Sequence, residues 1–110
     1  MINITVFQNS KKEYTGFKVM GHAGYAESGY DIVCASVSIL VTTTLNAIET
    51  YTTDDFIFES DEETGYMSCM FSTQLSEQSV LLCNTMLLGL NSIQATELYQ
   101  EYMHIIFEEV

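Results

Sequence analysis

The stretch that decides the fold is I-V-C-A-S-V-S-I-L-V-T-T-T-L-N-A-I-E-T-Y, residues 32–51. It contains no glycine or proline, and its large apolar residues recur at the three- and four-residue spacing of a helix. Threonine and valine are β-branched and lose rotamer freedom in a helix, so the periodicity rather than the composition predicts a helix here. The stripe consists of Val33, Val37, Leu40, Val41, Leu45 and Ile48.

The segments on either side of this helix look like strands. Before it, Ile2, Ile4 and Val6 alternate with other residues, and a polar turn separates them from a second apolar run, which predicts a hairpin. After it, two short apolar and aromatic runs flank an acidic turn, Asp61 to Glu63, which predicts a second hairpin. The predicted strands are 2–7, 14–20, 56–58, 66–71 and 102–107, and a second helix is expected from Thr73, as its N-cap, to Ile93.

The predicted order is therefore ββαββαβ. Hairpins imply a largely antiparallel sheet, and two helices of this length can cover one of its faces, so we expect an α+β fold. At 110 residues, without a linker or a repeat, residues 1–110 should form a single domain.

Acidic residues dominate the charge. There are 15 acidic residues against three basic ones, a formal net charge of −12. Nucleic-acid affinity comes mainly from lysine and arginine, so we expect no direct DNA or RNA binding. The same charge would attract a cationic protein, although it would also keep any protein soluble.

Cysteine usage and the N-terminus predict a reducing, cytoplasmic setting. The three cysteines show no C-x-x-C spacing, which argues against a disulfide framework or a zinc ribbon. The N-terminus lacks the basic start and cleavage site of a signal peptide. We also expect no apolar run long enough to span a bilayer, and so no membrane partner.

One histidine and one cysteine, His22 and Cys34, lie near the start of the first predicted helix. If Asp31 is the N-cap of that helix, Cys34 falls at its third position. Unpaired amides and the helix dipole lower a thiol pKa there, although the Asp31 carboxylate opposes this. The amides could also hold the oxyanion of a tetrahedral intermediate.

His22 ends the second predicted strand and has to fold back over the helix start. The connecting segment, 23–30, is a candidate substrate-gating loop. Gly24 and Gly29 give it hinges, and Tyr25 and Tyr30 give it aromatic surface or ordinary loop packing. A histidine within hydrogen-bond reach takes the thiol proton and later returns it to a leaving amine. Ser38, one turn beyond Cys34, could orient the imidazole.

From the residues alone, this pair is either a catalytic dyad or a coincidence, because most cysteines are small buried hydrophobes. Cys69 and Cys83 lie in apolar segments and are predicted to be core. His104 alternates with apolar residues on the last strand, so it is less favoured as a second histidine near Cys34. No spacing supplies the further ligands that a metal site would need.

The runs G-H-A at 21–23 and G-Y-D-I-V-C-A-S-V-S at 29–38 resemble the signature of the ribosomal-processing cysteine proteases, the Prp family of Firmicutes and related bacteria. The resemblance implies a cytoplasmic, homodimeric endopeptidase without a cofactor that removes a short N-terminal extension from a large-subunit ribosomal protein. It makes His22 and Cys34 the catalytic dyad, with Asp31 and Ser38 in supporting positions. Residues expected near the substrate are Gly21, Gly24, Tyr25, Gly29 and Tyr30.

Two other functions remain compatible with the residues. One is a non-catalytic acidic protein that binds a basic ribosomal protein or the ribosome. The other is a thiol redox switch centred on Cys34. Only the protease hypothesis requires His22 and Cys34 to act together on a peptide bond.

Overall fold

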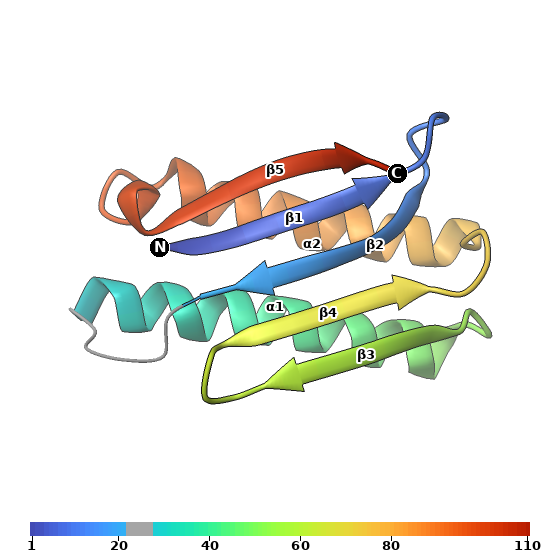
Figure 1. Ribbon diagram of the computed structural model, residues 1–110, viewed down its shortest axis with the longest axis horizontal. Coiled ribbons are helices and arrows are strands. Elements are labelled where there is room, and N and C mark those ends of the chain that lie inside the picture. Colours follow the sequence, from blue (N-terminus) through green and yellow to red (C-terminus); the bar gives the residue numbers. More distant parts are fainter. Residues whose placement is uncertain (22–27) are drawn as a thin grey trace.

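The computed structural model describes residues 1–21 and 28–110, with 28–31 described by their backbone (Figure 1). The predicted order ββαββαβ is confirmed, with one added 3₁₀ turn before the last strand. The elements are β1 (Ile2–Gln8), β2 (Tyr14–Met20), α1 (Ser28–Tyr51), β3 (Phe56–Asp61), β4 (Tyr66–Phe71), α2 (Glu77–Ala95), η1 (Gln100–Tyr102) and β5 (Met103–Glu109).

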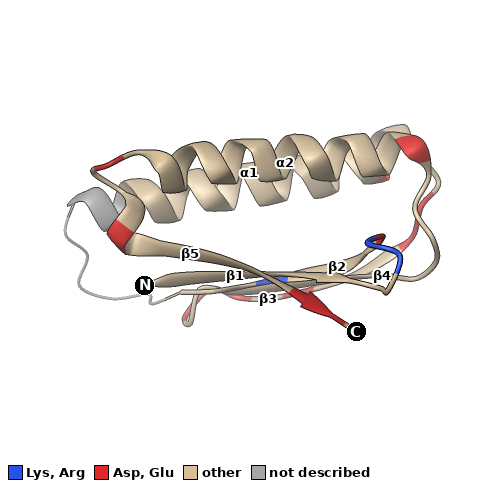
Figure 2. Cartoon of the chain, turned by 90° about the horizontal axis from the view of Figure 1, so that it is seen from above, with Lys and Arg blue, Asp and Glu red and all other residues tan. Residues whose placement is uncertain are grey.

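The strands form one five-stranded sheet in the order β3-β4-β2-β1-β5. The first three neighbouring pairs are antiparallel, and β1 and β5 run parallel from Ile2↔Met103 to Gln8↔Glu109. The parallel pair arises because the chain crosses over through α2 before β5. Figure 2 shows both helices on one face of the sheet, so the predicted α+β architecture is confirmed.

The core lies between this helix layer and the sheet. On α1, Val33, Val37, Val41, Leu45 and Ile48 are at most 5% exposed. They meet the inward residues of β1 and β2, which are Ile2, Ile4, Val6, Phe17 and Val19, each at most 3% exposed. The periodicity in the sequence therefore identified the buried faces of the helix and of the two strands.

Leu40, the remaining member of the predicted stripe, is half-buried between the two helices. A Cβ atom at Gly89 of α2 would lie 3.1 Å from both terminal methyl groups of Leu40. A glycine at position 89 therefore leaves the room that the Leu40 side chain fills.

The predicted start of the second helix is wrong. The helix begins at Glu77 with Ser76, not Thr73, as its N-cap, and the Ser76 hydroxyl accepts a hydrogen bond from the Ser79 amide. Asp54, from the α1–β3 connection, selects this start. Its Oδ2 accepts from the Ser76 amide at 3.1 Å, from Ser76 Oγ at 2.6 Å and from Ser79 Oγ.

The expectation that no apolar run could span a bilayer is also wrong by length and composition. Residues Ile32–Tyr51 of α1 have a mean hydropathy of 1.6 and are long enough to cross a membrane. The core helix of a globular protein passes the same test, and α1 packs its valine stripe on the sheet.

The Asp54 network predicts a pH-dependent stability. Hydrogen bonds from Ser76 and then Ser79 lower the pKa of Asp54 below its ordinary 3.8. Because the folded-state pKa is depressed, the stabilisation is present above the ordinary pKa and is lost as pH falls through the folded-state pKa. We expect Asp54→Asn to lower the free energy of unfolding by about 1 kcal/mol at pH 7, and the difference from wild type to shrink in acid.

Urea unfolding at pH 7 and at pH 3 measures both effects. Asp55→Asn is the matched control. The Asp55 side chain is exposed, so this substitution is expected to leave the free energy of unfolding unchanged within error. Equal losses of stability for the two variants would contradict the role of Asp54 in holding the Ser76 cap.

Candidate active site

Cys34 is held at the border of the core by its neighbours on α1. Val33 and Val37 are 0% and 1% exposed, whereas Cys34 is half-buried and packs against the core from its edge. Because the buried valines fix the rotation of the helix, the Cys34 side chain cannot turn fully inward or outward. It lies near the N-terminal end of α1, at the end of the molecule where β2 also ends (Figure 1).

The prediction that Asp31 caps the helix and that Cys34 is its third residue is wrong. The helix begins at Ser28, so Asp31 lies within it and residues 28–33 precede Cys34. Residues 28–31 extend the helix without adding to the apolar periodicity, which starts at Ile32, and the sequence pattern therefore missed them. The dipole effect falls off within the first turn, so it contributes little to lowering the pKa of a thiol at position 34.

The other predicted site residues are distributed around this helix start. Gly29 and Tyr30 belong to α1 and not to a loop, so the predicted loop 23–30 is wrong at its C-terminal end. Ser38 is exposed and lies one turn beyond Cys34. Gly21 is half-buried and directly follows β2. The predictions for His22, Gly24 and Tyr25 lie outside the described residues.

A glycine that sequence reasoning missed packs against Gly21. Gly65, in the β3–β4 turn, has φ +71°, a left-handed conformation that favours glycine. A Cβ atom at Gly65 would lie 3.1 Å from the Gly21 carbonyl oxygen and 3.4 Å from its carbonyl carbon. The signal in the sequence was a glycine ending an acidic hairpin turn, but nothing local indicated its partner.

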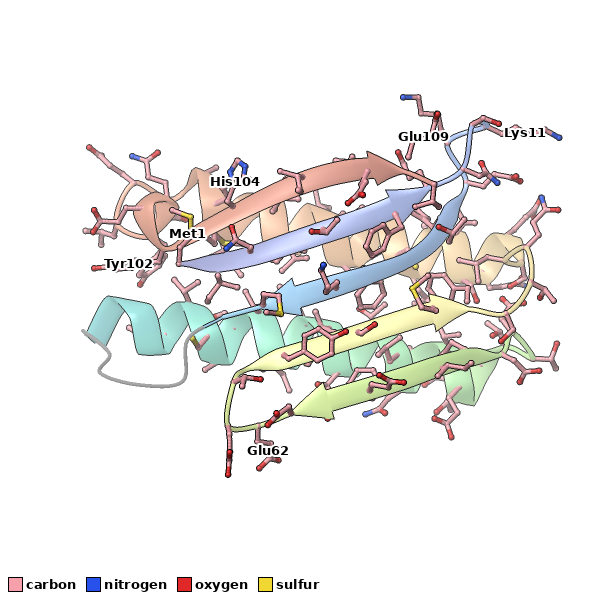
Figure 3. All side chains as sticks on the ribbon, in the orientation of Figure 1. Met1, Lys11, Glu62, Tyr102, His104 and Glu109 are labelled. Carbon is pink, nitrogen blue, oxygen red and sulfur yellow. The ribbon has the colours of Figure 1, made fainter. Side chains whose placement is uncertain are left out.

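The β3–β4 turn is exposed, as expected of a solvated hairpin end. The Asp61 carboxylate accepts a hydrogen bond from the Glu63 amide at 3.0 Å, and Glu62 lies at the outer end of the turn (Figure 3). Through Gly65, this acidic turn lies next to the end of β2.

The other two thiols are core residues, as predicted. Cys69 on β4 is 0% exposed and Cys83 on α2 is 2% exposed. Burial raises the pKa of each thiol to about 12, with the neighbouring Cys83 thiol adding to the effect on Cys69 and the Asp54 charge adding to that on Cys83. Neither is a nucleophile at neutral pH.

His104 faces away from Cys34. It is exposed on β5 and alternates with Met103, which is 1% exposed on the helix side of the sheet. The His104 side chain therefore lies on the face that the helices leave open, near the N-terminal end of β1 (Figure 3). Among the described side chains, no group of three or more His, Cys, Asp or Glu residues could hold a metal ion.

Comparison with known proteins identifies the family of the chain. The family model described as cysteine protease Prp matches residues 1–104. The chain belongs to the Prp family of cysteine proteases. It is therefore a cysteine protease, and Cys34 is the one cysteine in it that is not buried.

Curated Prp relatives are named ribosomal processing cysteine proteases. The one from Bacillus subtilis is 30% identical over 98 residues, which covers 86% of this chain and 88% of the relative. The one from Staphylococcus aureus is 28% identical over 108 residues, which covers 98% and 100%.

Solved structures of similar proteins have the same fold. The S. aureus protease in complex with a substrate peptide superposes with a TM-score of 0.90 at 26% identity, covering 98% of this chain and 100% of that one. SMU.848 from Streptococcus mutans superposes with a TM-score of 0.86 at 27% identity, covering 100% and 99%.

The burial of the three thiols predicts their reactivity. In native protein at pH 7.5, iodoacetamide should modify Cys34 at least tenfold faster than Cys69 or Cys83, because only the thiolate reacts and the two core thiols stay protonated and inaccessible. Peptide mass spectrometry after timed quenching measures the three rates, and the same reaction in urea is the control in which the rates should converge. Native labelling of Cys69 or Cys83 as fast as Cys34 would contradict this account.

Proposed function

We propose that the chain is an endopeptidase that removes a short N-terminal extension from a large-subunit ribosomal protein, with Cys34 as nucleophile and His22 as general base and acid. The observation that carries this proposal is the setting of Cys34: a half-buried thiol fixed between buried Val33 and Val37, near the end of β2 that leads to His22.

In the proposed reaction, the His22 imidazole takes the Cys34 proton, and the thiolate attacks the carbonyl carbon of the scissile bond. The resulting oxyanion is stabilised by hydrogen-bond donors that lie beside the Cys34 sulfur when the substrate is bound. The intermediate collapses to a thioester as the C–N bond breaks, and His22 gives its proton to the leaving amine. Water, activated by the same imidazole, then hydrolyses the thioester.

Supporting roles follow from position on α1. Ser38 lies one turn from Cys34 and is proposed to orient the imidazole or the substrate. Asp31, near the start of the helix, is proposed to support the histidine as its counter-charge. Gly21, Gly24, Tyr25, Gly29 and Tyr30 are proposed to meet the substrate.

The proposed substrate suits the charge of the enzyme. A ribosomal protein is basic, and a chain of net charge −12 attracts it over a range that shrinks as salt rises. The names of the relatives point to the same substrate class. Ribosomal proteins are made in the cytoplasm, which is the proposed location of the enzyme.

Cleavage of a ribosomal protein that bears its native extension tests the proposal. Wild type should release a shortened product, Cys34→Ala should release none, and His22→Ala should lose at least about 10²-fold in rate because proton transfer is lost. Intact-mass spectrometry identifies the product, and Cys69→Ala is the matched control that keeps Cys34.

Either of two results would sink the proposal: no product from wild type, or undiminished cleavage by Cys34→Ala. The first would favour a non-catalytic binder or a redox function of Cys34. Retained activity in His22→Ala alone would remove His22 from the mechanism and leave Cys34 in it.

We also propose a homodimer, formed through the outer face of the helix layer. Ile39 of α1 is 63% exposed, and Leu81 and Leu88 of α2 are 65% and 69% exposed, beside a shallow groove of about 220 Å³ between the helices. Residues 32–48 and 78–95 carry no charged side chain. Two copies of net charge −12 repel each other, so contact is favoured where charge is absent (Figure 2).

Light scattering after size exclusion tests the dimer. Wild type should have twice the 12.4 kDa mass of the chain, and Ile39→Glu with Leu88→Glu should give a monomer because it buries like charges against each other. Ile57→Glu is the matched control, since Ile57 is 64% exposed on β3, away from the helices. A monomeric wild type, or a double variant that stays dimeric, would contradict this interface.

A further inference from the structure

We propose that Gly65 is a positioning residue for the proposed reaction, acting through its contact with Gly21. This inference rests on the proposed function, because it assumes that the chain leaving Gly21 carries the general base. Gly65 lies in the turn between β3 and β4, more than forty residues from Gly21 in the sequence, and its neighbours assign it no chemical role.

The contact leaves no room for a side chain. A Cβ atom at Gly65 would lie 3.1 Å from the Gly21 oxygen, 3.4 Å from its carbonyl carbon and 3.8 Å from its Cα. The first of these distances is shorter than ordinary van der Waals contact, so Gly21 would have to move by a few tenths of an ångström. All three atoms are backbone atoms, which cannot move aside by changing rotamer as a side chain can.

The turn itself is rigidly placed. Its two strands pair along their whole length, from Phe56↔Phe71 to Asp61↔Tyr66, and β4 also pairs with β2 over Gly16↔Met70 to Val19↔Met67. Within the turn, the Glu63 amide donates a hydrogen bond to Asp61 Oδ1. Gly65 is therefore held by a hairpin that pairs with β2, the strand that ends just before Gly21.

Gly21 is the last described residue before His22, to which it is covalently bonded. Cys34 is fixed independently, by the packing of Val33 and Val37 on the core. The contact between Gly65 and Gly21 thus holds the backbone of the residue to which His22 is bonded. A catalytic group misplaced by 1 Å can cost about 10²-fold in rate, so a shift of a few tenths of an ångström should cost roughly three- to tenfold.

The test replaces Gly65 with residues that tolerate its backbone conformation. Asparagine and aspartate adopt positive φ more readily than other side chains, so Gly65→Asn and Gly65→Asp add the Cβ atom with the least strain in the turn. Two variants are made so that at least one folded protein is available, judged by a cooperative thermal melt. Thr64→Ala is the matched control: it alters the same turn, removes the long 3.4 Å contact from the Thr64 hydroxyl to the Asp61 carbonyl, and adds nothing near Gly21.

Two readouts separate positioning from general destabilisation. The first is cleavage, where the variant should lose roughly three- to tenfold in kcat; a change in KM would report the proposed contact of Gly21 with the substrate and not the position of the base. The second is the rate of Cys34 alkylation as a function of pH, whose midpoint should move if the base has moved relative to the thiol. Thr64→Ala should keep kcat within twofold of wild type and should leave the pH midpoint of Cys34 alkylation unchanged within error.

A folded Gly65→Asn or Gly65→Asp with wild-type kcat and an unchanged alkylation profile would overturn the inference. So would a fall in kcat with an unchanged profile, because the turn would then act elsewhere than on the thiol and its base. Failure of the proposed function is recognised separately, since wild type would then not cleave or Cys34→Ala would still cleave.

Discussion

The packing of one helix face on the sheet is the constraint on which the rest depends. Val33, Val37, Val41, Leu45 and Ile48 are at most 5% exposed and run the length of α1. Full burial of a side chain of this size is worth about 1.5–3 kcal/mol, so rotating α1 to expose the stripe would cost most of the stability of a small domain. Cys34, between the first two of these residues, inherits that fixed orientation.

The charged residues of the protein are unevenly distributed over its surface. The described acidic residues lie mainly at the ends of the helices, in the connections and on the strands, while most of the length of both helices is neutral (Figure 2). One molecule thus has an acidic surface, which the proposed basic substrate would meet, and a neutral helix face, which is the proposed contact with a second copy. At the end of the molecule that carries Cys34, the start of α1 and the end of β2 lie near the acidic β3–β4 turn, whose Gly65 contacts Gly21.

Sequence patterns located most of the fold because its strands are bounded by clear turns. The segments 14–20 and 66–71 are strands with those bounds. Helix starts were placed wrongly for two reasons. The apolar periodicity of α1 starts at Ile32, so residues 28–31 leave no pattern in the sequence. The cap at Ser76 depends on Asp54, twenty-two residues away. The motif around Cys34 indicated the family from the sequence alone. The contact between Gly65 and Gly21 joins backbone atoms that are distant in the sequence, so it leaves no local pattern.

The most direct test of the central claim, that Cys34 and His22 act as one dyad on a peptide bond, is a crystal structure of this chain with a peptide spanning the cleavage site. The account predicts a His22 ring nitrogen within about 3–4 Å of the Cys34 sulfur, given that hydrogen bonds to sulfur are longer than the roughly 2.6–3.2 Å of ordinary catalytic contacts. It also predicts the scissile carbonyl beside that sulfur. A peptide bound away from Cys34, or a His22 ring separated from the sulfur by other side chains while the peptide is in place, would contradict it.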